Sequence, residues 1–341
     1  MKKNTIQNIK MSNIAIYVAG DKIGDAILKY PVIRAFKEAL PVSTKIIWIT
    51  GNEPSAFFDQ LSFLNRQIID HFFIENDSIS NKERRTIFEQ YQIQCLINTE
   101  SRIKTGIKLK TFHKGMYICP ALNYLFSDIK PKTQSKNDSI FDRFYALLSL
   151  ATKKKLRLNF DIDIPKPYQQ YTDEILPDDN YIGFSLGASG YKKAWPLEHF
   201  IELARLKDKY SFKPVFFLGP NEDHLKKRLK TVISDCRIIP SNNLPNAINS
   251  VPLLTISAAK KLSFSVANDS GGGHLLACGR KPLLTLFGKN RAKKFLSPYC
   301  DQKCINTEDF GKKNVVDLEF KPVYDEFVNM IRSVRSKTRF G

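Results

Sequence analysis

Short apolar runs alternate with amphipathic stretches over the first half of the chain. Apolar runs of about 4–8 residues are typical of buried strands, and apolar positions spaced three and four apart are typical of helices. Strands are predicted at residues 14–18, 45–50, 67–74 and 93–98. Helices are predicted at residues 25–40, 54–61, 82–91 and 141–151.

The same alternation continues in the second half. Strands are predicted at residues 181–186, 215–218, 237–239, 262–267 and 283–287. Helices are predicted at residues 196–209, 221–234, 251–261 and 323–334, with a short helix starting near Gly273. Because strands that alternate with helices are joined by right-handed crossovers, the pattern predicts an α/β fold with parallel sheets covered by helices on both faces.

A polar stretch with several prolines at residues 152–179 separates the two series. A chain of 341 residues is long for one hydrophobic core, so two domains are expected. The predicted parts are a loose leader, a first domain, a linker, a second domain and a last helix placed to pack back on the first domain: residues 1–12, 13–165, 166–179, 180–321 and 322–341. Ligand loops are expected at the carboxyl ends of the strands, facing a cleft between the domains.

The composition adds a strong positive charge. Lys and Arg number 53 against 34 Asp and Glu, which gives a formal net charge of +19. Such a field attracts anionic lipid, nucleic acid or phosphorylated substrates, although a lysine-rich coding bias gives the same count. No nucleic-acid-binding module accompanies the charge, and aromatic residues are not interleaved with it, so no nucleic-acid partner is expected.

Cysteine usage and hydropathy indicate a cytoplasmic protein. The six cysteines are scattered, as reduced thiols are, and Cys300 and Cys304 form a lone C-x3-C pair without the other ligands of a metal site. Asp161-Ile162-Asp163 is interpreted as an edge strand or linker rather than a metal site. No run approaches the ~18 apolar residues of a membrane span, and the first residues lack the apolar core of a signal peptide.

The stretch at residues 268–288 carries the clearest candidate chemistry. Three consecutive glycines, at 271–273, follow a predicted strand and open a predicted helix. Their amide N–H groups can approach an anion closely, and the positive end of the helix adds to the attraction, which favours a phosphate site. A simpler interpretation stays open, in which Asp269 or Ser270 caps the helix and His274 is a packed or solvent-facing histidine.

The loop after the first predicted strand carries a second candidate. Its sequence at residues 19–25, Ala-Gly-Asp-Lys-Ile-Gly-Asp, fits neither the dinucleotide fingerprint nor a Walker-type phosphate loop, which disfavours a nicotinamide or ATP enzyme. A sheet-to-helix loop is expected to expose Asp25. Taken alone, its place after Gly24 favours an ordinary N-cap of the following helix.

Four segments together resemble glycosyltransferase family 9, the bacterial heptosyltransferases and their relatives. Residues 269–288 contain Asp-Ser-Gly-x-x-His, then Gly-x-Lys-Pro and Phe-Gly. Matching segments are Gly-Asp with Tyr-Pro-Val-Ile-Arg-Ala at 24–35, Gly-Ala-Ser with Lys-Ala-Trp-Pro at 187–200, and Gly-Pro-x-Glu at 219–222. The resemblance covers roughly residues 13–320. It implies the GT-B architecture, in which a Rossmann-like acceptor-binding domain and a Rossmann-like nucleotide-sugar-binding domain face a central cleft.

The resemblance also implies roles for particular residues. Asp25 matches the aspartate regarded as the catalytic base, and Lys193 supplies a positive charge to the departing diphosphate, with Lys192 as a competitor for that role. Asp269 is expected to hold hydroxyls of the donor sugar, and Glu222 the ribose of the nucleotide. The other residues implied at the donor are Ser189, Ser270, Gly271, Gly272, Gly273 and His274.

The implied activity is an inverting, metal-independent sugar transfer to a lipopolysaccharide-core or related glycolipid acceptor. ADP-L-glycero-D-manno-heptose is the leading donor, no cofactor is implied, and the basic surface suggests peripheral contact with the anionic inner membrane. Two positions depart from the family pattern: Ala19 stands where a basic residue is common, and Gly272 where a proline is usual, which is expected to loosen the loop. A nucleotide-sugar epimerase of the same architecture and a non-catalytic basic protein that binds membrane or nucleic acid stay open as alternatives.

Overall fold

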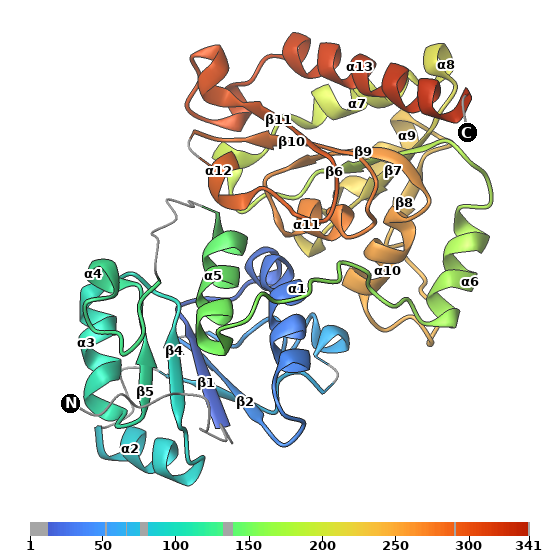
Figure 1. Ribbon diagram of the computed structural model, residues 1–341. Coiled ribbons are helices and arrows are strands. Elements are labelled where there is room, and N and C mark those ends of the chain that lie inside the picture. Colours follow the sequence, from blue (N-terminus) through green and yellow to red (C-terminus); the bar gives the residue numbers. More distant parts are fainter. Residues whose placement is uncertain are drawn as a thin grey trace. The chain divides into compact units, whose positions relative to one another are not determined.

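The computed structural model describes residues 13–51, 53–65, 67–75, 81–131, 139–289 and 291–339. The chain divides into two compact units, Met1–Asn159 and Phe160–Gly341, each built on one sheet (Figure 1). All strand pairs in both sheets are parallel, which confirms the predicted α/β class. The predicted leader at residues 1–12 lies outside the described residues.

The first unit has a five-stranded sheet in the order β3-β2-β1-β4-β5. Its strands are β1 (Asn13–Val18), β2 (Lys45–Thr50), β3 (His71–Ile74), β4 (Cys95–Asn98) and β5 (Met116–Ile118). Its helices are α1 (Ile23–Ala39), α2 (Asn81–Gln90), α3 (Ile103–Phe112), α4 (Ala121–Tyr124) and α5 (Ile140–Thr152). Ile14 of β1 lies beside both Ile46 and Cys95, so the strand order reverses at β1. Ligands of α/β sheets bind at the carboxyl end of such a strand, which is where the loop before Asp25 starts.

The central strands of this sheet are buried on both faces, which explains their continuous apolar runs. Every residue of β2 after Lys45 is buried. The ring of Trp48 meets the edges of Phe57 and Phe144, with centroids 5.6 and 6.1 Å away. Phe144 belongs to α5, which packs against α1, so these contacts fix the first helix on the sheet.

The second unit has a six-stranded sheet in the order β11-β10-β9-β6-β7-β8. Its strands are β6 (Tyr181–Ser185), β7 (Lys213–Phe217), β8 (Arg237–Ile239), β9 (Leu262–Asn268), β10 (Leu283–Phe287) and β11 (Gln302–Asn306). Its helices are α6 (Lys166–Ile175), α7 (Leu197–Arg205), α8 (Lys207–Tyr210), α9 (Leu225–Val232), α10 (Val251–Ala259), α11 (Gly271–Ala277), α12 (Ala292–Phe295) and α13 (Phe320–Arg339). The strand order reverses between β6 and β9, so the loops after these two strands diverge from a switch point.

The last helix belongs to the core of the second unit. α13 runs along the same face of the sheet as α7, whereas α10 and α11 lie on the opposite face (Figure 1). Phe327 of α13 is fully buried, and its ring contacts the rings of Phe184, Phe212 and Phe264. The apolar face of α13 covers the second sheet, and the prediction that this helix also packs back on the first domain stays a prediction.

The segment predicted as a linker, residues 166–179, contains α6. The Tyr168 hydroxyl donates to Asn249 Oδ1 at 2.8 Å, and the Thr172 and Ser257 hydroxyls lie 2.7 Å apart. These bonds hold α6 against α10 and its preceding loop. The boundary between the units therefore falls at residue 160, before this helix.

Candidate functional site

The donor-side residues predicted from the sequence gather at the carboxyl ends of β6, β7 and β9 in the second unit. Asn268, the last residue of β9, is fully buried and organises two of these ends. Its Oδ1 accepts from the Trp195 backbone N–H at 3.1 Å, and its Nδ2 donates to the Leu186 carbonyl at 2.9 Å. The loop after β6, which carries Ser189, Lys192 and Lys193, is thereby tied to the end of β9 at both of its own ends.

The two adjacent lysines in that loop differ in environment. Lys193 is partly buried and its Nζ donates to Ser189 Oγ at 3.0 Å, whereas Lys192 is exposed. Gly190 before them has φ 132°, a conformation that favours glycine. Trp195 follows them and donates through Nε1 to the Leu318 carbonyl at 2.9 Å. The geometry favours Lys193 over Lys192 for a fixed charge.

The turn from β9 into α11 brings the glycines close to neighbouring atoms. Ser270 caps α11, because its Oγ accepts from the Gly273 N–H at 3.4 Å, so this part of the simpler interpretation is correct. A Cβ at Gly272 would lie 2.5 Å from Ser185 Oγ, and one at Gly273 would lie 2.9 Å from the Asn268 carbonyl oxygen. His274 is buried in the first turns of α11, which excludes the solvent-facing alternative.

Asp269 lies among charged groups that the sequence analysis did not bring together. It is 5% exposed, and its Oδ2 accepts an ion-paired hydrogen bond from Arg291 Nε. Burial lowers the pKa of the Lys193 amine, the charge of Arg291 lowers this pKa further, and the Asp269 carboxylate opposes both. Two cations and one buried carboxylate therefore influence one another at this edge of the sheet.

Arg291 was not predicted as a site residue. It lies directly before α12, after the strand β10, and within the basic run at residues 289–294. Its guanidinium carbon lies 4.2 Å from the centroid of the Phe295 ring. A basic run shortly after a predicted strand was the available signal, but the sequence does not show which of its cations turns toward Asp269.

Glu222 is fixed at the carboxyl end of β7. It closes a 3-10 turn, Pro220–Glu222, and its Oε2 accepts from the Gly219 N–H at 2.9 Å. A Cβ at Gly219 would lie 2.7 Å from that oxygen, and one at Gly187 would lie 3.2 Å from it. The two glycines thus make room for a partly buried carboxylate between the loops after β6 and β7.

Asp25 lies in the first unit, as the third residue of α1, and is partly buried. The N-cap position of α1 is Lys22, so Asp25 does not cap the helix. The loop before it is anchored by Asp21, whose buried carboxylate accepts from Lys29 Nζ at 2.9 Å, Trp48 Nε1 at 3.0 Å and Ser55 Oγ at 2.6 Å. Asp21 is therefore a structural residue that fixes where α1, and with it Asp25, begins.

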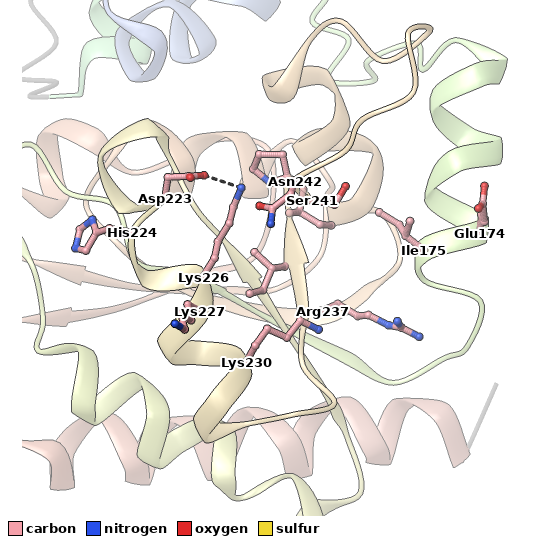
Figure 2. Close-up of a pocket in the computed structure, with 13 residues that line it drawn as sticks. Glu174, Ile175, Asp223, His224, Lys226, Lys227, Lys230, Arg237, Ser241 and Asn242 are labelled. Carbon is pink, nitrogen blue, oxygen red and sulfur yellow. Dashed lines mark ion pairs between the residues drawn. The ribbon is translucent and has the colours of Figure 1, made fainter.

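A cavity of about 770 Å³ lies beside the edge strand β8 (Figure 2). Its charged lining residues are Glu174, Asp223, Lys226, Lys227, Lys230 and Arg237, and its apolar ones are Ile175, Ile238, Ile239 and Pro240. The Lys226 amine pairs with Asp223 at 2.6 Å. The cavity contains none of the predicted site residues, and positive side chains commonly protect an edge strand from pairing with another chain.

Within the described part of the chain, no three His, Cys, Asp or Glu side chains are grouped as a metal site. Asp161 pairs with Arg280 instead. Burial raises the pKa of the Cys300 thiol to about 12 and that of Cys304 to about 11, so both stay protonated at neutral pH. None of the described helices has the length and hydropathy needed to cross a membrane.

Comparisons with known proteins agree with this architecture. The family model of glycosyltransferase family 9 (heptosyltransferase) matches residues 107–321, and no curated protein matches the sequence. A glycosyltransferase family 9 protein from Veillonella parvula DSM 2008 has a TM-score of 0.65 at 17% identity, covering 94% of this chain and 97% of that chain. ADP-heptose lps heptosyltransferase II of E. coli has a TM-score of 0.63 at 16% identity, covering 95% and 99%. The structure of the E. coli heptosyltransferase WaaC with ADP has a TM-score of 0.60 at 16% identity, covering 94% of this chain and 98% of that chain.

The two parallel sheets and these matches define a glycosyltransferase fold of the GT-B class. The chain belongs to glycosyltransferase family 9, whose family model spans more than half of its 341 residues. The family match favours a transferase over the epimerase and non-catalytic alternatives.

Proposed function

We propose that the protein transfers a sugar with inversion from a nucleoside diphosphate donor, ADP-heptose being the leading candidate, to a lipopolysaccharide-core or related glycolipid acceptor. The observation that carries the proposal is the family match over residues 107–321, which includes every donor-side residue predicted from the sequence. The named structural relatives from E. coli are heptosyltransferases, which supports heptose as the first sugar to try.

The chemistry asks for one base and for stabilisation of a leaving anion. In the proposed step the acceptor oxygen forms a bond to the anomeric carbon while the bond from that carbon to the diphosphate oxygen breaks. The acceptor hydroxyl proton passes to Asp25, and the nucleoside diphosphate leaves with the bonding electrons. Lys193 and the amides at 271–273 stabilise the leaving diphosphate, with Ser270 and His274 bordering it.

The remaining proposed contacts are with the sugar and the ribose of the donor. Asp269 holds hydroxyls of the sugar, and Glu222 accepts from the ribose. One Glu222 oxygen is used by the Gly219 N–H, which leaves its other oxygen as an acceptor for a ribose hydroxyl. Ser189 supports this arrangement by holding the Lys193 amine.

The nucleotide is the part of the proposal to test first. Thermal unfolding of the purified protein should be measured with ADP, UDP, GDP and dTDP in parallel, because a ligand at about 100 times its dissociation constant stabilises the folded state by roughly 2.7 kcal/mol. We expect a clear rise in the midpoint with ADP alone. A rise with another nucleotide replaces the proposed donor, and no rise with any of the four contradicts a nucleoside diphosphate donor.

The proposed transfer needs no metal, because lysine and backbone amides carry the positive charge at the leaving group. Turnover is therefore expected to be the same before and after dialysis against EDTA. A loss that Mg²⁺ restores would show that a cation takes part at the diphosphate.

The basic surface is proposed to hold the enzyme against the anionic face of the inner membrane, where its acceptor would be found. The support is the net charge of +19, since each well-placed Lys or Arg contributes about 1 kcal/mol near an anionic surface. Sedimentation with vesicles should increase strongly from neutral to anionic lipid at low salt. Equal binding to neutral and anionic vesicles would contradict a role of the positive charge in membrane binding.

A further inference from the structure

Arg291 is a cation at the proposed donor site for which the family resemblance gave no role. Its side chain is about one-third exposed (31%), whereas that of Asp269 is almost fully buried (3%), so the guanidinium lies between a buried carboxylate and solvent. Only its Nε is used by Asp269; among the described residues, its two terminal nitrogens have no hydrogen-bond partner. Four N–H bonds of one planar group are therefore available to an incoming ligand.

The position of this guanidinium is fixed by its neighbours rather than left to rotamer freedom. The Asp269 carboxylate holds it from one direction, and the Phe295 ring lies 4.2 Å from the guanidinium carbon. Asp269 in turn is placed by its backbone N–H, which donates to the Leu286 carbonyl at 3.2 Å. A preorganised guanidinium loses little entropy when it binds an anion.

The local charge favours an anionic ligand. Burial lowers the pKa of the Lys193 amine, and the nearby charge of Arg291 lowers it further. One carboxylate, Asp269, faces these two cations, so one positive charge is left over at the turn into α11. Guanidinium groups bind phosphate oxygens through two parallel hydrogen bonds, which an amine cannot do.

We propose that Arg291 is a second cationic ligand of the donor's diphosphate, holding Asp269 through Nε while its terminal nitrogens bind phosphate oxygens. This inference rests on the proposed function and extends it. One residue then couples the two halves of the donor, because the guanidinium that binds the diphosphate also orients the carboxylate proposed for the sugar hydroxyls. Lys193 and Arg291 would share the charge that develops on the leaving group.

The alternative is that Arg291 acts only through Asp269. Binding of a nucleoside diphosphate without a sugar separates the two roles, because Asp269 is proposed to contact the sugar alone. Calorimetric titration should use whichever of ADP, UDP, GDP and dTDP stabilises the wild type, together with inorganic diphosphate, which does not depend on the base. The variants are Arg291→Gln and the matched control Lys293→Gln, which removes an exposed charge two residues away.

We expect Arg291→Gln to weaken both ligands at least about tenfold, as loss of a charged hydrogen bond does, and Lys293→Gln to change them less than about twofold. The pair Asp269→Asn and Asp269→Asn/Arg291→Gln covers the case in which the single variant does not fold, because the double variant leaves no buried charge unpaired. If the double variant binds inorganic diphosphate about tenfold more weakly than Asp269→Asn does, the lost affinity is due to Arg291 itself. Equal affinity of Asp269→Asn and the double variant for the ligand would overturn the proposal. Equal losses of affinity in Arg291→Gln and Lys293→Gln would overturn it as well.

The two proposals fail differently. If the wild type binds none of the four nucleotides but Arg291 still controls inorganic diphosphate, the anion site stands and the donor assignment falls. If a nucleotide binds equally to the wild type and to the folded Arg291→Gln variant, the proposed function stands and the role of Arg291 at the diphosphate falls.

Discussion

At the scale of single residues, the structure separates groups that hold the fold from groups free to react. Asp21 and Asp25 lie four positions apart, but Asp21 is buried with three donors on its carboxylate, whereas Asp25 is partly exposed and does not cap its helix. The buried Asp21 carboxylate already accepts three hydrogen bonds, so it is placed to hold the fold rather than to meet an acceptor hydroxyl. For the two lysines the held side chain is the candidate: Lys193 is partly buried and held by Ser189, which suits a fixed charge, whereas Lys192 is exposed.

Substitution Asp25→Asn tests the base directly. The amide keeps the size of the side chain but cannot take the acceptor proton, so turnover should fall at least about 100-fold. Affinity for the nucleotide should stay within a factor of about two, because the donor residues lie in the other unit. The measurements are kcat with donor and acceptor and Kd by calorimetry. Turnover within a few-fold of the wild type would remove Asp25 from the reaction.

The lowered pKa of Lys193 predicts how binding of a nucleoside diphosphate depends on pH. The diphosphate binds the protonated amine, so affinity is full at pH 7 and falls as the pH rises through the folded pKa, which lies below the usual lysine value of about 10.4. Calorimetry between pH 7 and 10 should show this decline. In Lys193→Arg the decline should disappear, because a guanidinium stays charged. An identical pH dependence in both proteins would show that another group titrates.

At the scale of elements, close backbone approaches decide how the turn into α11 tolerates change. Gly273 faces a backbone carbonyl, which cannot move without shifting β9, whereas Gly272 faces the Ser185 hydroxyl, which can rotate. The sequence marks both positions only as glycine. The expectation that Gly272 loosens this loop stays a prediction.

Alanine at these two positions should therefore have unequal effects. Gly273→Ala is expected to destabilise by about 1–3 kcal/mol through overpacking, and Gly272→Ala to stay within about 1 kcal/mol of the wild type. Urea unfolding of the two variants, with matched m-values, measures the difference. Equal losses, or the reverse order, would show that the turn relaxes in a way these contacts do not predict.

At the scale of the whole molecule, the second unit depends on its C-terminal helix. Removing the Phe327 ring takes away contacts with rings from β6 and β9 and with Phe212, so Phe327→Ala should cost about 3–5 kcal/mol. The chain has two tryptophans, Trp48 in the first unit and Trp195 in the second. In a Trp48→Phe background, tryptophan fluorescence therefore reports the unfolding of the second unit alone. Adding Phe327→Ala should lower the urea midpoint of that unit. An unchanged midpoint would contradict the place of α13 in this core.

The pattern of apolar and polar residues was enough to predict the class of the fold and the loops that carry the candidate residues. Apolar runs predicted β1, β2, β9 and β10 within one or two residues, because strands buried on both faces need continuous apolar sequence. The family resemblance named the glycines at 271–273, Glu222 and Lys193. Because these residues follow strands, and loops at the carboxyl ends of parallel strands share one edge of the sheet, they were expected at that edge.

The partners of these residues could not be predicted from the sequence and are known only from the folded chain. The segment predicted as a helix at 54–61 is a series of turns instead, and its start is fixed by bonds from Ser55 Oγ and the Ala56 N–H to Asp21, far away in sequence. The strands β5 and β11 were not predicted; they form by pairing with β4 and β10. Arg291 meets Asp269, and α13 covers its own sheet, because packing and charge pairing act between residues distant along the chain.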